Sequence, residues 1–335
     1  MPRPALETRL AASWPPDAWQ DLTVLAAVSG GADSVGLVGA LAALKTAGTG
    51  RLAVAHFNHR LRPAAADEAR FVASLAARLE LACELGEGSV AEAAASQGDG
   101  LEAAARSQRY AFLQATAERI GARYVVTAHT ADDQAETILH RILRGTGVAG
   151  MAGMRRARPL GAAVTLIRPL LDIRRAEIRD YLAELGQPFH EDVTNGNPAF
   201  TRNRIRHDLL PRLAEYNPDV IGALLRLAET AREAQRIVDA EVEELLDAAL
   251  LPPASPEQVV INCGALTRTN RHLVRELFVA IWRDRGWPQQ AMGFAEWDAL
   301  AEMALHPSRQ APQRILPGRI AAQKTGERLS LARLS

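Results

Sequence analysis

The sequence is poor in cysteine: its 335 residues include only Cys83 and Cys263, and these form no CxxC pair. Structural zinc sites, iron–sulfur clusters and dithiol redox sites are built from closely spaced cysteines, so the sequence argues against all three. We expect both cysteines to be packed, unreactive thiols.

Long apolar runs and net charge are absent as well. No run approaches the roughly 18 residues that a membrane-spanning helix needs, and the N-terminal segment lacks the apolar stretch of a signal peptide. We therefore expect a cytoplasmic protein with no membrane partner. Because 39 lysines and arginines balance 39 aspartates and glutamates, a nucleic-acid partner would have to be recognised through a local basic patch.

The composition is typical of a folded protein. Hydrophobic residues make up 48% and charged residues 23% of the chain, which argues against wholesale disorder. At about 150 residues per domain, the length favours two domains. We predict a larger domain over residues 1–215 and a smaller one over residues 216–335.

The first 130 residues alternate apolar runs with alanine-rich helical stretches, a pattern that predicts an α/β domain with a parallel sheet. Near-continuous apolar runs indicate strands buried on both faces. The predicted strands are Thr23–Ser29, Arg51–Asn58, Ala122–His129 and Val164–Ile167. The predicted crossover helices are Ser34–Lys45, Asp67–Leu81 and Leu101–Ile120.

The rest of the chain is mainly helical in its periodicity. Asn217-Pro218 precedes a long charged helix that we expect to end near Leu250. A loop at Leu251–Gln258, two more helical stretches and a terminal hairpin around Leu316–Gly318 should follow. We therefore predict a smaller, mainly helical C-terminal domain.

Charge is distributed unevenly along the chain. Between Arg141 and Arg179 there are nine arginines and two acids, a net charge of +7. Between Leu213 and Leu250 there are nine acids and three arginines, a net charge of −6. The acidic stretch is most simply a solvated helix face. The basic stretch contains glycines and loops, which favours phosphate binding.

The clearest motif is Ser29-Gly30-Gly31-Ala32-Asp33-Ser34, which runs from the first strand directly into a helix. Adjacent glycines allow a tight turn whose N–H groups face one concavity, and the helix N-terminus adds partial positive charge. Asp33 beside phosphates requires a bridging cation, so the economical interpretation is Mg²⁺ binding. The alternative is a plain turn in which Asp33 or Ser34 caps the helix. No lysine follows the glycines, so the motif is a poor match to a Walker A loop.

A second cluster follows the predicted strand Ala122–His129. Asp132 and Glu136 are four residues apart and Asp133 and Glu136 are three apart, so their carboxylates share one face of a helical turn. This arrangement makes a cation pocket at a strand end, where open α/β sheets bind ligands. The alternative is that these acids only cap the helix and complement its dipole.

SGGADS resembles the PP-loop of the N-type ATP pyrophosphatases. Further segments follow at family-like spacing, and together they resemble the tRNA(Ile)-lysidine synthetase family over about residues 20–215. These segments are HFNHRLR, TAHTADDQAET, RILRGTGVAGMAGM, IRPLL and DVTNGNPAFTRNRIR. The remaining residues resemble the family's first C-terminal helical domain, and we expect the chain to be too short for the additional domain of longer members.

The resemblance implies an adenine nucleotide alpha hydrolase-like domain that uses ATP and Mg²⁺. Family members join the L-lysine ε-amine to C2 of the wobble cytidine of tRNA(Ile) with a CAU anticodon, which switches codon reading from AUG to AUA. ATP first adenylates the base with release of pyrophosphate, and lysine then displaces AMP. The C-terminal domain would bind tRNA, and a homodimer is one alternative for the assembly.

The resemblance also suggests roles for individual residues. The proposed catalytic residues are Asp33, which would hold Mg²⁺, and Arg109, Asp133 and Glu136. ATP would bind Ser29, Gly30, Gly31, Ala32, Asp33, Ser34, His56 and Asn58, and lysine would bind Asp133, Glu136 and His129. His59 also lies near the expected adenosine. Contacts to phosphate or tRNA would come from Arg62, Arg106, Arg141, Arg144, Arg155, Arg156, Arg202, Asn203, Arg204 and Arg206. The family often has a second histidine at the position of Thr130.

Three other functions remain as alternatives. A PP-loop tRNA thiolase would need catalytic or cluster-binding cysteines, and neither cysteine lies in a motif. An amide-forming synthetase would need a glutaminase domain or an external source of ammonia. A catalytically inactive tRNA-binding protein predicts loss of Asp33, Asp133 or Glu136, all of which are present.

Overall fold

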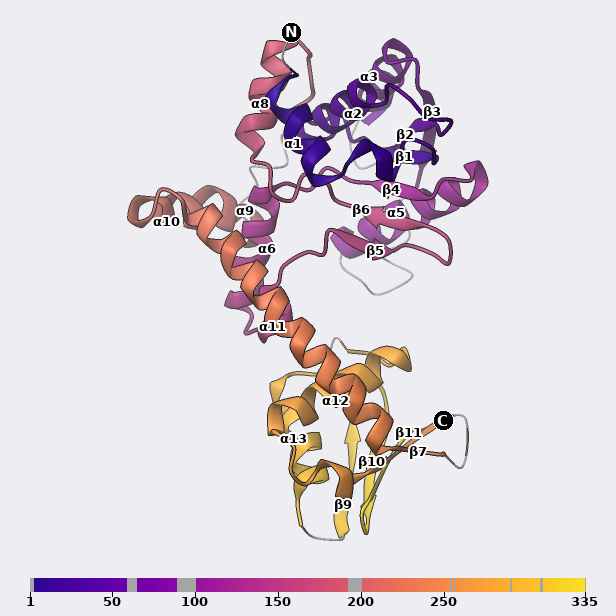
Figure 1. Cartoon of the computed structure of the whole chain (residues 1–335), viewed down its shortest axis with the longest axis vertical. Coiled ribbons are helices and arrows are strands. Elements are labelled where there is room, and N and C mark those ends of the chain that lie inside the picture. Colours follow the sequence, from indigo (N-terminus) through magenta and orange to yellow (C-terminus); the bar gives the residue numbers. More distant parts are fainter. Residues whose placement is uncertain are drawn as a thin grey trace. The chain divides into compact units, whose positions relative to one another are not determined.

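The first part of the chain is built on a six-stranded sheet with β1 (Val24–Ala27) near its middle (Figure 1). The strand order is β3-β2-β1-β4-β6-β5, and every neighbouring pair is parallel except β5 with β6. The other strands are β2 (Leu52–Asn58), β3 (Ala82–Glu87), β4 (Tyr124–Val126), β5 (Ala157–Pro159) and β6 (Thr165–Ile167). The predicted α/β fold with a parallel sheet is therefore confirmed.

The computed structural model describes residues 3–58, 65–88, 101–191, 201–253, 255, 257–289, 291–307 and 310–334. The chain divides into two compact units, Met1–Glu229 and Thr230–Ser335. The division falls inside the long helix α11 (Val220–Ala249), whereas the sequence pattern placed it before that helix, at 215/216.

Strand β1 is apolar throughout because its successive side chains point to opposite faces of the sheet and both faces are buried. Val24 and Ala26 pack in one core cluster, whereas Leu25 packs in another on the opposite face of the sheet. Burial on both faces removes the polar alternation of a half-exposed strand. The first cluster takes residues from α1, α2, α3 and α8, and the second takes residues from α5.

The helices of the first unit agree closely with the predicted crossover segments. Helices α2, α3 and α5 all connect parallel strands. The helices are α1 (Ala5–Ser13), η1 (Pro16–Ala18), α2 (Ala32–Leu44), α3 (Ala65–Arg78), α5 (Leu101–Ile120), α6 (Ala131–Leu143), α7 (Val148–Met151), α8 (Arg175–Glu184), α9 (Thr201–Arg204), η3 (Ile205–Leu209) and α10 (Leu210–Tyr216).

The strand order places a ligand site at a definite position. From β1 the chain first adds β2 and β3 on one side, and then crosses to place β4 on the other side of β1. Ligands of open α/β sheets bind outside the carboxyl ends of the strands at such a reversal. The SGGADS motif follows β1 and the DDQAE segment follows β4, so both lie at that reversal.

The second unit contains helices α12 (Arg271–Asp284) and α13 (Phe294–Leu305), η4 (Cys263–Leu266) and a five-stranded antiparallel sheet. The sheet has the order β7-β8-β11-β10-β9. Its strands are β7 (Leu250–Leu251), β8 (Gln258–Asn262), β9 (Gln310–Leu316), β10 (Ile320–Thr325) and β11 (Arg328–Arg333).

The sequence pattern predicted the helices of this unit and its terminal hairpin, which is β9–β10, but not the rest of the sheet. Strand β8 is a short apolar run whose partner β11 lies some 70 residues later in the chain. Short apolar runs do not distinguish a strand from a helix when the pairing partner is distant.

Across the described residues, none of the helices is both long enough and apolar enough to cross a membrane.

Candidate active site

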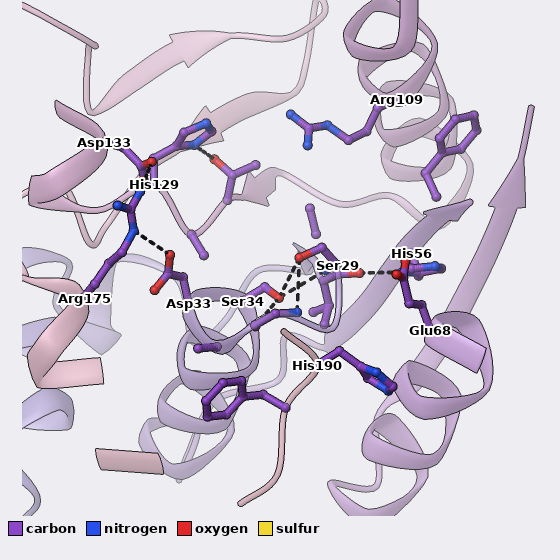
Figure 2. A pocket seen from close by; sticks show the side chains of 18 of the residues that line it. Ser29, Asp33, Ser34, His56, Glu68, Arg109, His129, Asp133, Arg175 and His190 are labelled. Atoms are coloured by element: carbon purple, nitrogen blue, oxygen red, sulfur yellow. Dashed lines mark hydrogen bonds and ion pairs between the residues drawn. The ribbon is translucent and has the colours of Figure 1, made fainter. Parts of the chain in front are cut away.

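A cavity of about 680 Å³ opens at the reversal point of the sheet (Figure 2). Its walls come from the PP-loop, the ends of β2 and β4, helices α5, α6 and α8, and residues 189–191. The predicted residues Ser29, Gly31, Ala32, Asp33, Ser34, His56, Arg109, His129, Asp133 and Arg206 all line it. Segments far apart in the sequence therefore meet in one cavity.

Hydrogen bonds of Ser29 and Ser34 fix the conformation of the PP-loop. Gly30 has φ +93°, a conformation that favours glycine, and Gly31 precedes helix α2. Ser34 Oγ donates to Gly31 O over 2.9 Å and accepts from the Ser29 N–H over 3.1 Å. From the segment after α8, the His190 N–H donates to Gly30 O over 2.9 Å. The loop conformation is thus fixed from both sides.

His56 presents an unpartnered acceptor beside this loop. Its Nδ1 lies 2.8 Å from the carbonyl oxygen of Val28 and must donate to it, because a carbonyl only accepts. In that tautomer Nε2 is an acceptor, and it is buried with no hydrogen-bond partner in the described part of the chain. Because His56 lines the cavity, Nε2 suits a ligand amino or hydroxyl group.

Asp133 has one oxygen in a helix cap and the other in the site. Thr130 is the N-cap of α6, and both its N–H and its hydroxyl donate to Asp133 Oδ2 over 2.9 Å. Asp133 Oδ1 instead accepts from Arg202 Nη2 over 3.1 Å and from Arg175. The capping and cation-binding interpretations of this residue are therefore compatible. The structure also gives Thr130 a role of its own, that of orienting Asp133.

Glu136 is completely buried and is surrounded by three arginines. It accepts hydrogen bonds from Arg175 Nη1 at 2.9 Å, Arg202 Nε at 2.9 Å and Arg206 Nε at 2.6 Å. Burial disfavours the charged carboxylate, but the hydrogen bond from Arg206 and the charge of Arg175 outweigh it and hold the pKa of Glu136 below its usual value. Burial likewise opposes ionisation of Asp133, yet Arg175 and Arg202 lower the pKa of that carboxyl. Both acids are charged.

Asp33 is coupled to this acid pair through Arg175. Arg175 Nε lies 3.3 Å from Asp33 Oδ2, and Figure 2 shows its guanidinium between Asp33 and Asp133. Burial, supported by the charge of Asp133 and opposed by Arg175, raises the pKa of Asp33 to about 6. Functional sites commonly contain a carboxyl group whose pKa is raised in this way.

His129 lies between the acid pair and Arg109. Its Nδ1 is 3.0 Å from Thr127 Oγ1. Burial, together with the charges of Arg168, Arg109 and Arg202 and despite the opposing charge of Asp133, lowers the pKa of His129 to about 3. His129 is therefore a neutral imidazole in this structure.

The remaining predicted residues have different surroundings. Arg141 donates to Gly150 O at 3.0 Å and Gly153 O at 2.8 Å, which ties its guanidinium to the loop after α6. Arg156 contacts Pro169 O, Ser13 and Asp172. The exposed side chains of Arg144, Arg155 and Arg204 form no hydrogen bond or ion pair within the described residues. Asn58 ends β2 and Asn203 lies in α9, and neither lines the cavity. His59 and Arg62 lie outside the described residues.

Arg175 is the main site residue that the sequence analysis missed. It was counted only in the basic stretch, yet it binds Asp33, Asp133 and Glu136. The signal was its position shortly after β6, at the same edge of the sheet as the PP-loop. Asp132, considered with the acid cluster, instead accepts from the Arg175 N–H at 2.9 Å and holds the start of α8. Phe189, His190 and Glu191 also line the cavity and were not singled out.

Comparison with known proteins agrees with this geometry. The model of the PP-loop domain family matches residues 4–213. In the solved structure of the U34-tRNA thiolase NcsA from Methanococcus maripaludis, the matched region covers 68% of this chain and 78% of that one, with a TM-score of 0.58 and 16% identity. At this identity the likeness shows the fold alone.

Three relatives carry the name tRNA(Ile)-lysidine synthase. The protein of Geobacter sulfurreducens is 41% identical over 76% of this chain and 53% of its own length. The protein of Rhodopirellula baltica is 34% identical over 84% and 79%, and that of Thermus thermophilus is 36% identical over 98% and 59%. The chain thus spans little more than half the length of two of these three relatives. Family match and sequence identity together place it in the tRNA(Ile)-lysidine synthase, or synthetase, family of PP-loop proteins.

Proposed function

We propose that this chain joins the ε-amine of L-lysine to C2 of the wobble cytidine of tRNA(Ile) with a CAU anticodon, using ATP, and so switches codon reading from AUG to AUA. One observation carries the proposal. Asp133 of the charged acid pair lines the same cavity as the PP-loop, and the completely buried Glu136 is joined to Asp133 through Arg175, so a cation pocket and a phosphate site face one reaction volume.

The PP-loop supports the adenylation step. Attack of the cytidine O2 on the α-phosphate of ATP releases pyrophosphate, so negative charge grows on the β-phosphate side. The backbone N–H groups around Gly31 and the N-terminus of α2 suit that charge. His56 Nε2 is an unpartnered acceptor on the same wall, which suits the amino or hydroxyl groups of adenosine.

Asp33 fits a Mg²⁺ ion. Magnesium is commonly held by one or two protein carboxylates together with substrate phosphates. The described residues contain no group of three or more acids, histidines and cysteines that could hold a metal ion without such phosphates. Asp33 lies in the first turn of α2 and lines the cavity. When bound, the ion would neutralise phosphate charge.

The acid pair supports the second step. Lysine has a side-chain pKa of about 10.4 and arrives as an ammonium ion, whereas only the neutral amine attacks C2 to displace AMP. Asp133 Oδ1 and Glu136 hold the ammonium and help to remove its proton. The neutral imidazole of His129 adds no positive charge of its own beside that ammonium.

Lysine entry requires a rearrangement of charge. Arg175, Arg202 and Arg206 already neutralise Asp33, Asp133 and Glu136, so the incoming ammonium must displace a guanidinium. Arg202 has the most exposed side chain of the three, at 39%. Because its transfer to water costs least, we propose that Arg202 yields its place to lysine.

The tRNA contacts rest on exposed basic side chains. Arg144, Arg155 and Arg204 are free of ion pairs within the described residues, and such side chains suit the phosphate backbone. We also propose that the C-terminal unit contributes to tRNA binding. Phosphate contacts of this kind position the RNA without specifying its sequence.

The decisive test is incorporation of labelled lysine into unmodified tRNA(Ile) with a CAU anticodon by the purified chain. We expect incorporation that requires ATP and Mg²⁺ and that does not occur with tRNA(Met), which bears the same anticodon. Release of pyrophosphate without lysine incorporation would retain the adenylation chemistry and require a different nucleophile.

A second test concerns Asp33. Asp33→Ala should abolish tRNA-dependent pyrophosphate release while tRNA affinity changes by no more than a few fold. Loss of tRNA binding as well would mean that Asp33 maintains the fold of the site.

A further inference from the structure

Arginines from three separate chain segments surround one tyrosine on the α5 side of the sheet. The guanidinium carbons of Arg106, Arg109 and Arg158 lie 4.9, 5.3 and 4.9 Å from the centre of the Tyr110 ring. Arg168, which follows β6, adds a fourth charge close to the tyrosine hydroxyl. We call these five residues the Tyr110 cluster.

Among the residues that the structure describes, no carboxylate pairs with these four arginines. Arg158 Nη1 donates to Pro159 O at 3.0 Å and Arg168 Nη1 donates to Arg155 O at 2.7 Å, and both acceptors are neutral carbonyl oxygens. This contrasts with the acid pair, where every guanidinium meets a carboxylate.

The cluster also contains buried polar atoms without partners. Arg109 Nε and Arg168 Nε are buried and have no hydrogen-bond partner in the described residues, whereas the Tyr110 hydroxyl interacts with Arg168. Arg168 is only 3% exposed. Buried donors and charges that lack partners are costly, so an arrangement of this kind suits an anionic ligand.

The electrostatic environment agrees with this. Burial alone would raise the pKa of the Tyr110 hydroxyl, but the charges of Arg106, Arg109 and Arg168 lower it below its usual value. Burial lowers the pKa of Arg168, and the neighbouring Arg158 and Arg106 lower it further. The region therefore has a positive potential that no acid among the described residues neutralises.

We propose that the Tyr110 cluster binds a phosphate group, with Arg158 and Arg168 as previously unassigned ligands. A guanidinium group binds two phosphate oxygens through paired hydrogen bonds. Several guanidinium groups close together therefore suit the oxygens of one phosphate monoester or diester. The tyrosine ring holds three of the guanidiniums by cation–π contact and so keeps them in place before the anion arrives.

The position of the cluster favours RNA as the source of the phosphate. Arg109 belongs to the cluster and also lines the PP-loop cavity, so the two sites are adjacent. The PP-loop already supplies a site for the phosphates of ATP. The second site therefore suits a backbone phosphate next to the base being modified, an assignment that rests on the proposed function.

The test compares Arg158→Gln with Arg123→Gln in the full chain. Both arginines donate to a single carbonyl oxygen, Pro159 O for Arg158 and Ala163 O for Arg123, but Arg123 lies at the amino end of β4, away from the cavity. Binding is measured with a tRNA(Ile) transcript over a range of salt concentrations, and with ATP and inorganic pyrophosphate separately.

We expect Arg158→Gln to weaken tRNA binding about tenfold and to make the slope of log K against log salt shallower by about 0.7–0.9. Arg158→Lys should restore the slope but not the full affinity, because lysine keeps the charge without the paired donors. Arg123→Gln should change neither quantity.

Two results would overturn parts of the proposal. A tenfold loss of ATP or pyrophosphate affinity with unchanged tRNA binding would show that the phosphate belongs to the nucleotide. Unchanged affinity for all three ligands in a folded Arg158→Gln protein would eliminate the phosphate site. Because these are binding measurements, a chain that binds tRNA through the cluster but incorporates no lysine would contradict only the proposed function.

Discussion

Arg175 Nη1 donates a hydrogen bond of 2.9 Å to Glu136 Oε1, although the two residues are 39 positions apart in the sequence. The contact joins the first residue of α8 to the second turn of α6, and the same guanidinium also reaches Asp33 beside the PP-loop. The charge of Asp33 in the PP-loop and the charge of the acid pair are thus coupled through one side chain. A ligand cation that enters the acid pair changes the surroundings of Asp33.

The first prediction concerns Glu136. Glu136→Gln removes a charge that is completely buried and bonded to three arginines. Removing one partner of such a pair costs about 2–5 kcal/mol, so we expect the KM for lysine to rise at least about 30-fold. Pyrophosphate release that depends on tRNA should change much less.

The control for this variant is Glu84→Gln, which also removes a glutamate paired with an arginine, Arg119, at 2.7 Å but outside the cavity. It should leave the KM for lysine within about twofold. A thermal melt of both variants separates misfolding from loss of the site. An unchanged KM in a folded Glu136→Gln protein would contradict the lysine assignment.

The second prediction contrasts the two glycines of the PP-loop. Gly30 has φ +93°, whereas Gly31 has φ −75°, and a Cβ on Gly31 would meet nothing closer than 3.6 Å. Gly30→Ala should lower the free energy of unfolding by about 1–2 kcal/mol, and Gly31→Ala by much less. Denaturant unfolding measures both, and equal losses would show that the conformation of Gly30 is not what requires glycine.

The third prediction is a pH dependence of stability. The pKa of His129 is lowered to about 3 in the folded protein, mainly by burial, whereas an unfolded histidine has a pKa of about 6.5. Below pH 6.5 the unfolded chain binds a proton at His129 and the folded chain does not, so the free energy of unfolding falls as the pH falls. The loss approaches about 1.4 kcal/mol per pH unit between pH 6.5 and about 3.

His129→Gln removes this proton uptake and should flatten the profile. Between pH 7.5 and pH 5 the variant should lose about 2 kcal/mol less than the unsubstituted chain. His306→Gln, at an exposed position in the second unit, is the control. Parallel profiles for His129→Gln and the unsubstituted chain would place the His129 ring in contact with solvent.

The fourth prediction separates lysine ligation from sulfur transfer. Cys83 packs at the edge of the first core cluster and Cys263 lies in the core of the second unit, and neither lines the cavity. Burial and nearby Glu84 raise the pKa of Cys83, and burial raises that of Cys263 despite Lys324, so both stay protonated thiols. The double variant Cys83→Ala, Cys263→Ala should retain lysine incorporation within about threefold. Complete loss of lysine incorporation in a folded double variant would favour the thiolase alternative.

Local sequence determined the parts of the fold and site that depend on short-range pattern. Residues 24–28 are apolar throughout because both faces of β1 are buried, and glycine at position 30 marks the positive φ after that strand. The spacing of Asp133 and Glu136 was sufficient to place both acids on one helical face. The order of these motifs also identified the family.

Only the tertiary structure decided which charges meet. That Arg175 bridges Asp33 and Glu136, and that Arg158 and Arg168 surround Tyr110, depends on strand order and on the packing of α8 and β5. A count of charges along the chain finds nine arginines in one stretch but cannot say which of them face acids and which lack them. Coulomb energy depends on distance and burial in space, and neither is a function of sequence separation.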